Sequence, residues 1–413
     1  MDSRMGYTSG QSRRSGHSKP VLVILGIMGQ TPFAGVAWQV LHYLEGFRRL
    51  GYDVYYVEDT GDWPYDPEQN TITGDCRYTV HYLARLMAWL DMSDKWAYRF
   101  GGDGQTFGLS ESEVSRLFKR ADALVNLTAS TWLFERHLDI PVRIYLETDP
   151  VLRQIEVARG RQDTTELLRA HTHHFSYGEN FGAADCGVPL GQFEYRPTRQ
   201  PVVLDWWDSV AIHCSDSADH FTTVGSWKQS GKDIEWDGET YTWSKHFEFL
   251  KFIDLPGRSG QSFELALACG ESEDIELLIT RGWKVVDGLA LSKDIEPYRD
   301  YIFGSRGEFT VAKDQNIRLR SGWFSDRSAC YLAAGRPVIT QETGFSKFLP
   351  TGKGLFSFRT MEEILAAMDA IASDYEGNRR AAREIAAEYF AAEKVVGDIL
   401  ERAGIASSLA THK

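Results

Sequence analysis

Several features that assign a sequence to a class at once are missing from this one. The 413 residues include only five cysteines and no Cys-x-x-Cys pair, so neither a disulfide framework nor a cysteine zinc site is predicted. Positive charge is not in excess, because the net charge is −13, which argues against bulk binding of nucleic acid or of an anionic membrane. Internal repeats and low-complexity tracts are also absent.

Long apolar runs are lacking as well. The longest run near the start, residues 21–28, is far too short to span a bilayer. Residues 1–18 are polar and basic without an apolar stretch, so we expect a disordered lead-in rather than a signal peptide. The cysteines are scattered, as is typical of reduced thiols, and we therefore expect a cytoplasmic protein without a transmembrane segment.

What the sequence does contain is a globular composition in a chain too long for one ordinary core. Hydrophobic residues make up 43% and charged residues 25% of it, and its length suits two domains. Near the start, the apolar run VLVILG leads into a glycine turn, a helical pattern at 37–51 and a strand at 53–59. This βαβ unit predicts a parallel sheet with a right-handed crossover, and further strands are predicted at 122–128 and 142–150.

The sequence pattern changes around residues 196–210, where two prolines predict a linker to a second α/β series. A turn-rich insertion at 225–262 suggests a hairpin between Trp236 and Trp243, and a long helix is predicted at 378–404. We predict an α/β fold of two Rossmann-like doubly wound domains that face each other across a cleft, where such sheets bind ligands. The predicted parts are a lead-in at 1–18, a first domain at 19–200, a second domain at 201–380, and a C-terminal helix at 381–413 that packs back on the first domain.

The stretch SGWFSDRSACYLAAGRPVIT, residues 321–340, is the most informative part of the chain. Ser325, Asp326 and Ser328 are N-cap candidates before a helical pattern, which Gly-Arg-Pro ends ahead of an apolar strand. A helix N-terminus presents free backbone N–H groups, and Arg327 adds a bidentate donor, so the stretch predicts an anion site. The alternative is a capped helix with a solvated arginine.

The segments CYLAAGRPVITQETGF and LPTGKGLFSFRTMEEILAAMDAI resemble the C-terminal half of GT-B glycosyltransferases. The first unit of the chain, with Pro32 and Gly35 in its glycine loop, resembles the start of their acceptor domain. The similarity is strongest over residues 321–372, followed by residues 20–60. Within the superfamily the chain is most similar to a group that carries GWFSDRSACYLAAGRPV. The resemblance implies an N-terminal acceptor domain and a C-terminal domain that binds a nucleotide sugar.

The resemblance also implies which residues contact the ligands. The donor diphosphate is expected at the helix that starts near Ser325, within reach of Lys228 and Lys232, and Trp227 is expected to form a wall for the base or sugar. An exposed loop is the alternative for Trp227 and Lys228. The expected donor-binding residues are Trp227, Lys228, Lys313, Gly322, Ser325, Asp326, Arg327, Ser328, Thr343, Gly344 and Phe345. The expected acceptor loop consists of Gly29, Gln30, Thr31 and Gly35.

One departure from the family pattern limits what the resemblance transfers. Many retaining members carry two glutamates eight positions apart, the second one just before the Ala-Ala-Gly. The corresponding positions here are Gly322 and Cys330, and neither residue is acidic. The sugar contacts of those members are therefore not carried over, and the choice between inversion and retention stays open.

The candidate catalytic residues come from the end of a predicted strand. Inverting members often place a base histidine in the first glycine loop, but here that loop carries Gln30, and His42 lies within the following helix. The segment YLETDP places Glu147 and Asp149 at a strand end that faces the predicted cleft. An inverting transfer needs one base near the acceptor hydroxyl, and we predict Asp149 in preference to Glu147. The alternative is a helix cap that follows the strand.

His171, His173 and His174 are candidate metal ligands, because His171 and His173 share a face on a strand. No cysteine or acidic partner stands nearby at ligand spacing, so we expect no metal. Transfer on the GT-B fold does not generally need one, since a helix dipole and basic side chains stabilise the leaving diphosphate. No cofactor is expected beyond the nucleoside-diphosphate sugar as co-substrate.

The function that these observations favour is transfer of a sugar from a nucleoside-diphosphate sugar, such as a UDP-sugar, to an acceptor hydroxyl. The expected partners are the donor and a small-molecule or glycan acceptor. Two alternatives stay open. One is a nucleotide-sugar 2-epimerase, which shares the fold, and the other is a non-catalytic GT-B-like protein that binds a nucleotide sugar, because a fold does not fix a function.

Overall fold

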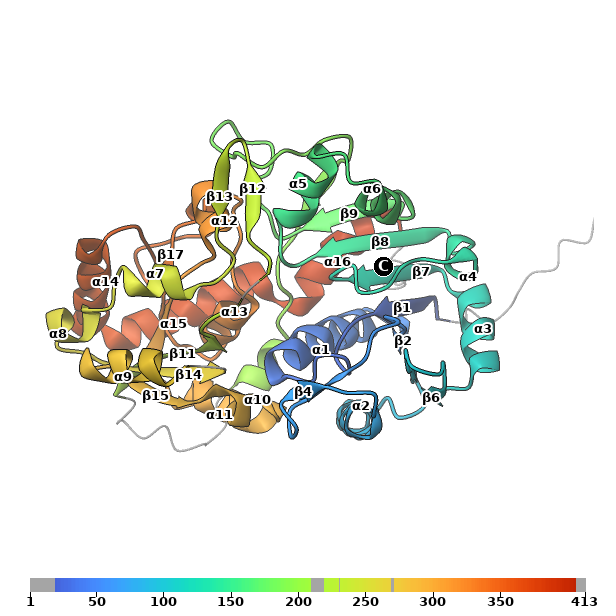
Figure 1. Cartoon of the computed structure of the whole chain (residues 1–413), viewed down its shortest axis with the longest axis horizontal. Coiled ribbons are helices and arrows are strands. Elements are labelled where there is room, and N and C mark those ends of the chain that lie inside the picture. Colours follow the sequence, from blue (N-terminus) through green and yellow to red (C-terminus); the bar gives the residue numbers. More distant parts are fainter. Residues whose placement is uncertain (1–18, 209–218, 230, 269–270, 406–413) are drawn as a thin grey trace, which may run out of the picture.

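The computed structural model describes residues 19–208, 219–229, 231–268 and 271–405. Figure 1 shows two α/β halves side by side, with the first half of the chain on the right and the second half on the left. Within the described ranges, every helix is too short or too polar to cross a membrane. The predicted fold class, two Rossmann-like domains that face each other, is confirmed.

The first half is built on an eight-stranded sheet with the order β10-β9-β8-β7-β1-β2-β5-β6. Its strand pairs are parallel except for the edge pair β5–β6. The strands are β1 (Val21–Leu25), β2 (Asp53–Glu58), β5 (Trp96–Arg99), β6 (Thr106–Gly108), β7 (Ala123–Leu127), β8 (Val142–Glu147), β9 (His173–Ser176) and β10 (Tyr195–Pro197). The helices are α1 (Ala34–Arg49), α2 (Arg77–Trp89), α3 (Glu111–Arg120), α4 (Glu135–Leu138), α5 (Leu152–Ala158) and α6 (Gln162–Arg169).

The second half is built on a six-stranded, all-parallel sheet with the order β15-β14-β11-β16-β17-β18. The strands are β11 (His220–Ser226), β14 (Ser262–Ala268), β15 (Lys284–Asp287), β16 (Gly307–Thr310), β17 (Val338–Gln341) and β18 (Leu355–Phe358). The helices are α7 (His246–Leu250), α8 (Leu255–Ser259), α9 (Ser272–Thr280), α10 (Gly288–Ser292), α11 (Ile295–Phe303), α12 (Asp314–Arg318), α13 (Asp326–Ala333), α14 (Met361–Ser373) and α15 (Tyr375–Ile385).

Apolar runs explain where the central strands lie. Every residue of β1 is buried, as expected for a parallel strand that helices cover on both faces. Two small hairpins stand outside the sheets, β3 (Tyr65–Asp66) with β4 (Thr71–Ile72), and β12 (Ile234–Trp236) with β13 (Glu239–Tyr241). The second hairpin confirms the one predicted between Trp236 and Trp243.

The long helix predicted at 378–404 is wrong. After α15 the chain forms a π-helical turn at Ala386–Phe390, and α16 (Ala392–Arg402) begins only after an extended residue, Ala391. The physical reason is a pairing with the linker between the halves. The Val202 N–H donates to the Phe390 carbonyl at 2.7 Å, and the Ala392 N–H donates to the Val202 carbonyl at 2.9 Å. A continuous helix would need those groups for itself.

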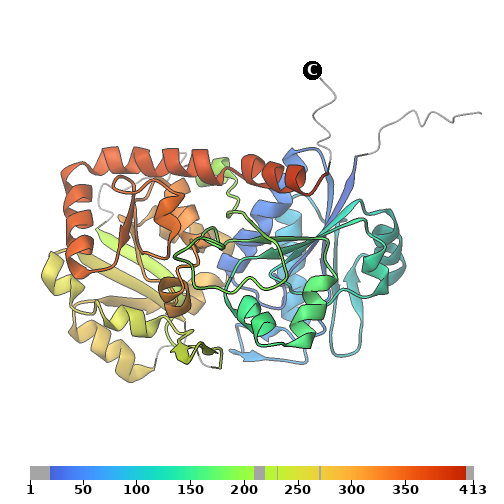
Figure 2. The ribbon, with the colours of Figure 1, turned by 90° about the horizontal axis from the view of Figure 1, so that it is seen from above.

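The break allows the C-terminal helix to return to the first half. Figure 2 shows α15 and α16 running along one side of the molecule from the second half to the first. There α16 packs on α1, where a Cβ at Gly46 would lie 3.3 Å from Ala392 and from Val396. The predicted contact of the C-terminal helix with the first half thus corresponds to α16.

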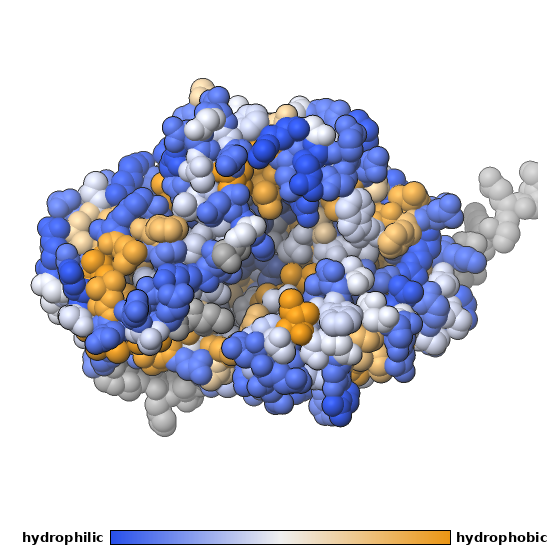
Figure 3. All heavy atoms as spheres, in the orientation of Figure 1, coloured by the Kyte–Doolittle hydropathy of each residue, from blue (hydrophilic) through white to orange (hydrophobic). Residues whose placement is uncertain are grey.

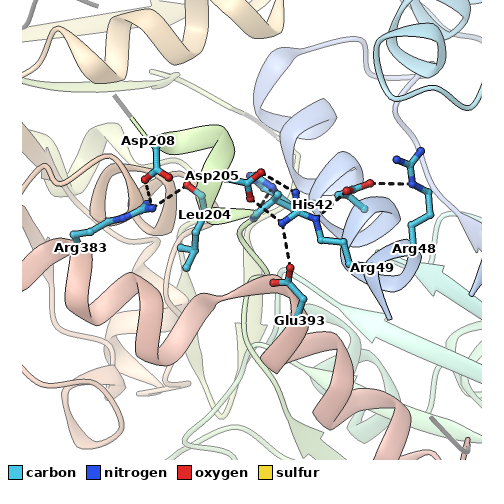
Figure 4. A network of polar contacts seen from close by, with 10 residues as sticks. His42, Arg48, Arg49, Leu204, Asp205, Asp208, Arg383 and Glu393 are labelled. Carbon is cyan, nitrogen blue, oxygen red and sulfur yellow. Dashed lines mark hydrogen bonds and ion pairs between the residues drawn. The ribbon is translucent and has the colours of Figure 1, made fainter. Parts of the chain in front are cut away.

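Polar contacts hold the linker in the angle between α1 and the C-terminal helices (Figure 4). Arg49 on α1 pairs with Asp205 of the linker at 2.7 Å and with Glu393 at 3.1 Å. Arg383 pairs with Asp208 and also donates to the Leu204 carbonyl at 3.1 Å. Elements from both halves are therefore tied to one short segment.

Close packing at Gly46 gives the first testable expectation. Gly46→Leu should lower the free energy of unfolding by about 1–3 kcal/mol, because the added side chain overlaps α16. Gly397→Ala is the matched control on α16, since among the described residues its Cβ would meet only Leu50, at an ordinary 3.7 Å. That variant should gain roughly 0.5–1 kcal/mol from helix propensity. Urea unfolding measures both, and a loss in the control equal to that in Gly46→Leu would contradict this packing.

Candidate functional site

A cavity of about 310 Å³ lies between the two halves. Figure 3 shows the surface hollowed near the middle of the molecule. The cavity is lined by the first turns of α1, by the carboxyl ends of β11 and β14, and by the start of α13. Its walls include Phe33, Gly35, Val36, Gln39, His42, Gln200, Val224, Gly225, Ser226, Ala268, Gly288, Tyr298, Ser325, Asp326, Arg327 and Cys330. Parallel sheets bring strand ends and helix N-termini to one edge, which is why these segments meet here.

The N-terminus of α13 opens into this cavity. Ser325 stands at the predicted N-cap position with extended backbone, and its side chain makes no capping hydrogen bond. Asp326 follows at the first helical position and contacts Gln39 and Tyr177, and burial raises its pKa to about 6. Ser328 is fully buried within the second half and does not line the cavity. The backbone N–H groups of this first turn provide positive potential at the cavity wall.

Arg327 lines the cavity but is held by its own domain. Its Nε donates to the buried carboxylate of Glu308 at 2.6 Å, Nη2 donates to the Thr310 hydroxyl at 2.8 Å, and Nη1 donates to the Val224 carbonyl. The guanidinium lies next to Gly225, where a Cβ would be 3.8 Å from Nη1. These contacts use three of its five N–H donors, so two remain for a ligand. Its fixed position suits recognition of a phosphate better than a mobile side chain would.

Two lysines extend the positive region beyond Arg327. Lys313 precedes α12, forms an ion pair with Asp149 of the first half and lies 3.2 Å from the centre of the Trp243 ring. Lys245 precedes α7 and stands 5.2 Å from the centre of the Trp323 ring. Burial, followed by the charges of Arg327 and Lys313, lowers the pKa of Lys245 to about 7. Among the described residues, Lys245 has no ion-pair partner.

Lys245 was missed by the sequence prediction, which selected Lys228 and Lys232 instead. The insertion that carries the β12–β13 hairpin separates Lys245 from the end of β11 in the sequence. The sequence feature that could have pointed to Lys245 is its position just before α7, the first helix of the second half, in the segment WSKHFEFL. Lys228 forms ion pairs with Glu271 at 2.8 Å and with Asp274 at 2.7 Å.

The two candidate catalytic carboxylates have different surroundings. Glu147 is buried and accepts hydrogen bonds from Tyr145 at 2.9 Å, from Gln154 at 2.9 Å and from Ser176 at 2.6 Å. Burial raises the pKa of Glu147 to about 7. Asp149 is only partly buried, and while its Oδ2 accepts from Lys313, its Oδ1 has no hydrogen-bond partner among the described residues. Asp149 Oδ1 is therefore a buried acceptor atom without a partner among the described residues, whereas both carboxylate oxygens of Glu147 accept hydrogen bonds.

The predicted acceptor loop is folded around a carboxylate of its own domain. The N–H groups of Gly29 and Gln30 donate to Glu58, at 2.7 Å for Gly29, and the Tyr56 hydroxyl donates to it at 2.6 Å. Burial raises the pKa of Glu58 to about 7. Within the predicted loop set, Gly35 lines the cavity, whereas Gly29, Gln30 and Thr31 do not.

Several predicted donor contacts lie away from the cavity. The Trp227 ring is 1% exposed and packs against Phe249 in the core of the second half, so it offers no face to a ligand. Gly322 and Gly344 have positive φ and pack against Asn180 of the first half. Thr343 donates to the Trp323 carbonyl at 2.6 Å. Phe345 is buried against Phe324. These residues form contacts between and within the halves.

The three histidines considered as metal ligands make other contacts. His171 is buried, its Nδ1 lies 2.9 Å from the Leu167 carbonyl, and burial lowers its pKa to about 3. His174 Nε2 lies 2.9 Å from the Leu168 carbonyl. In the part of the chain that the structure describes, no group of three or more His, Cys, Asp and Glu side chains is arranged to hold a metal ion.

Comparison with known proteins identifies the fold of the chain. Neither a protein-family model nor a curated protein matches the chain. Solved structures do match over nearly the whole length. An α-glucosyltransferase in complex with UDP and a 13-mer DNA containing an HMU base has 10% identity and a TM-score of 0.58, over 93% of this chain and 99% of that chain. AviGT4, a glycosyltransferase involved in avilamycin A biosynthesis, has 11% identity and a TM-score of 0.54, over 93% and 97%.

HepE from Anabaena, solved in complex with UDP and glucose, has 12% identity and a TM-score of 0.54, over 93% of this chain and 99% of that chain. The chain therefore has the GT-B fold, in which two Rossmann-like domains face each other across a cleft. The fold predicted from the Ala-Ala-Gly-Arg-Pro-Val-Ile turn and the first glycine loop is confirmed.

The pair between Arg327 and Glu308 generates a stability prediction. Glu308 is fully buried and the Arg327 side chain is 14% exposed. Glu308→Gln should lower the free energy of unfolding by about 3–5 kcal/mol, because it leaves the guanidinium without a counter-charge. The double variant with Arg327→Met should recover part of that loss, and chemical denaturation measures both. If the single and double variants were equally unstable, the cost would come from lost packing and not from an unpaired charge.

Proposed function

We propose that this chain is a glycosyltransferase that moves a sugar from a nucleoside-diphosphate sugar to an acceptor hydroxyl. The observation that carries the proposal is Lys245, which is partly buried beside Arg327 and Lys313 and has no ion-pair partner among the described residues. Three cationic side chains share this region, and burial, followed by the charges of the other two, lowers the pKa of Lys245 to about 7. Such an arrangement is costly without a ligand and is relieved by an anion that carries more than one charge.

A diphosphate fits this region in charge and in position. The N-terminus of α13 and the two uncommitted N–H donors of Arg327 face a cavity that lies between the two sheets. A nucleoside diphosphate bound there would place its sugar toward the first half, where Asp149 ends the β8 turn. UDP is the first nucleotide to test, since solved structures of similar fold hold UDP.

The proposed chemistry is a group transfer across the cleft. The acceptor oxygen bonds to the anomeric carbon while the bond from that carbon to the diphosphate breaks, and the acceptor proton passes to Asp149 Oδ1. Negative charge develops on the departing diphosphate, where Lys245, Arg327 and the α13 N-terminus stabilise it. Asp149 is proposed as the base because its buried Oδ1 makes no hydrogen bond with the described residues, while the carboxylate of Glu147 already accepts from three side chains.

The experiment that tests the function is a thermal-shift screen against UDP-, GDP-, ADP- and dTDP-sugars, because any ligand of the folded state raises the melting temperature. The donor that binds is then followed for slow hydrolysis without an acceptor. Stabilisation together with released nucleoside diphosphate supports a transferase. Stabilisation with intact donor supports a non-catalytic binder, and isomerisation of the free nucleotide sugar supports an epimerase. No shift with any donor would rule out nucleotide-sugar binding.

Donor binding should depend on pH through Lys245. With a pKa of about 7 in the free protein, Lys245 is mostly neutral at about pH 8, and a bound diphosphate raises its pKa again. The diphosphate of UDP-glucose does not titrate near neutrality. Binding of UDP-glucose at about pH 8 should therefore take up about one proton. The dissociation constant should rise by up to about tenfold per pH unit above pH 7. Calorimetry in buffers of different ionisation enthalpy measures the proton uptake.

Lys245→Met should abolish the proton uptake and weaken binding at low pH, whereas Lys251→Met is the matched control. Lys251 follows α7, and its exposed side chain already pairs with Glu248 at 2.6 Å, whereas Lys245 has no ion-pair partner among the described residues. The control should keep both the affinity and the proton uptake. Unchanged uptake in Lys245→Met would show that another group is responsible.

Asp149→Asn should lower the turnover of the transfer reaction by about 10²–10⁴-fold, because the amide cannot accept the acceptor proton. Donor affinity should change little. The matched control is Asp185→Asn, because Asp185 also pairs with a lysine of the second half, Lys347, across the two halves. That variant loses the ion pairs of Asp185 with Lys347 and Arg320 between the halves but no proposed base, so its turnover should stay close to that of the wild type. Equal losses in both variants would assign Asp149 to domain contact alone.

A further inference from the structure

A second hollow, called the side groove here, opens on the first half next to the interdomain cavity. It has a volume of about 600 Å³ and lies between the β3–β4 hairpin, α2 and the start of α11. Its floor and walls include Asp66, Tyr78, Tyr82, Arg85 and Asp294. None of these residues has a part in the function proposed above.

The linings of the side groove and of the interdomain cavity adjoin along two stretches of chain. Ser292 lines the cavity, and the next two residues, Lys293 and Asp294, line the groove. On the other side, the ring of Phe33, which lines the cavity, lies 5.3 Å from the ring of Tyr65 beside the groove residue Asp66. The two hollows therefore lie next to each other on the molecule.

One buried polar group in the side groove lacks a partner. Tyr82 is 3% exposed, and its hydroxyl makes no hydrogen bond with any described residue. The groups whose charges act on this hydroxyl are Tyr78, Arg85 and Asp294, all of which line the groove. A buried hydroxyl without a partner is unfavourable, and a ligand in the groove that offers a hydrogen-bonding group would satisfy it.

Aromatic faces accompany these polar groups. The rings of Tyr78 and Tyr82 are stacked, with centroids 6.2 Å apart and an interplanar angle of 16°. At the rim, the Trp63 side chain is 53% exposed, and its ring lies 3.7 Å from the Cβ position of Gly74, next to the groove residue Asp75. An exposed tryptophan beside polar groups suits a ligand with both apolar and hydroxyl-bearing faces, such as a sugar ring.

The charges of the side groove favour an uncharged ligand. Both arginines already have carboxylate partners, Arg77 in Asp75 and Arg85 in Asp294. The carboxylates that remain accept hydrogen bonds, which suits the hydroxyl groups of a sugar and repels phosphate or carboxylate groups. Among the described residues, Lys293 is the one lining lysine without an ion pair, so a polyanionic acceptor such as nucleic acid would meet few free cations here.

We propose that the side groove binds a neutral oligosaccharide, and that this oligosaccharide is the acceptor whose end reaches the interdomain cavity. This inference rests on the proposed glycosyltransferase function. In it, Tyr82 donates or accepts one hydrogen bond with a sugar hydroxyl, and Trp63 stacks on a sugar ring at the rim. Tyr82 and Trp63 are binding residues and take no part in the chemical step.

The test is calorimetric titration of the full chain with four neutral hexasaccharides, made of cellulose, maltose-type glucan, mannan and chitin units. A hexamer of galacturonic acid and a single-stranded 13-mer DNA serve as anionic probes. We expect saturable binding of at least one neutral hexasaccharide. Tyr82→Phe should weaken it by about fivefold to tenfold through the loss of one hydrogen bond, and Trp63→Ala should weaken it as well.

Tyr195→Phe is the matched control, because Tyr195 is also a buried tyrosine of the first half but lies on the edge strand β10, far from the groove lining. It should leave the affinity unchanged. Tyr82→Phe should keep the wild-type melting temperature or raise it, since it removes an unsatisfied hydroxyl, so weaker binding would not reflect damage to the fold. Equal affinities of wild type and Tyr82→Phe would overturn the assignment.

Binding of UDP-glucose, measured in parallel, separates this inference from the proposed function. Nucleotide binding without binding of any neutral hexasaccharide, or with binding of the anionic probes only, overturns the inference and leaves the function standing. Hexasaccharide binding that Tyr82→Phe weakens, without nucleotide binding, supports the groove as a carbohydrate site and overturns both the transferase function and the acceptor role.

Discussion

The arrangement of the two halves depends on the main-chain pairing of Val202 with the break in the C-terminal helix. Its N–H and carbonyl bind Phe390 and Ala392 on the two sides of Ala391, so the linker and the returning chain fix each other. A single hydrophobic cluster then runs from the first sheet through α1 to α13. Because α1 and α13 share this cluster, their N-termini are held at the walls of one cavity. The linker and the returning C-terminal chain therefore help to form the site.

Charge in the cleft is distributed unevenly between the halves. The second half contributes Lys245, Lys313 and Arg327, while the first half contributes Asp149 at the end of β8. Lys313 bridges the two sets through Asp149, whereas Arg327 is neutralised within its own domain by Glu308. Lys245 is thus the one cation of this set that lacks a counter-ion among the described residues. The anion that completes the site is therefore expected against the second half, which agrees with a donor bound there and an acceptor that approaches from the first half.

The sequence predicted the parts of this structure that local patterns determine. Buried runs such as VLVIL and glycine turns located the central strands, and the Ala-Ala-Gly-Arg-Pro-Val-Ile turn identified the fold. Contacts between distant segments were not predictable. The break at Ala391 depends on Val202, and the burial of Trp227 depends on Phe249. Lys245 was not predicted because an inserted hairpin separates it from β11 in the sequence. The sequence did not mark Tyr82 as a binding residue, because a hydroxyl without a partner can be recognised only when the positions of its neighbours are known.

The buried Glu147 illustrates how a residue can serve a site without facing it. Directly after the Asp149-Pro150 pair, Val151 has a φ of 98°, which is strained for a β-branched residue. Gln154 accepts a hydrogen bond from the Val151 N–H at 2.8 Å and donates to both oxygens of Glu147 at 2.9 Å. The carboxylate therefore stabilises an unfavourable turn through Gln154. That turn places Asp149 beside Lys313 of the second half, so Glu147 helps to determine where the proposed base stands.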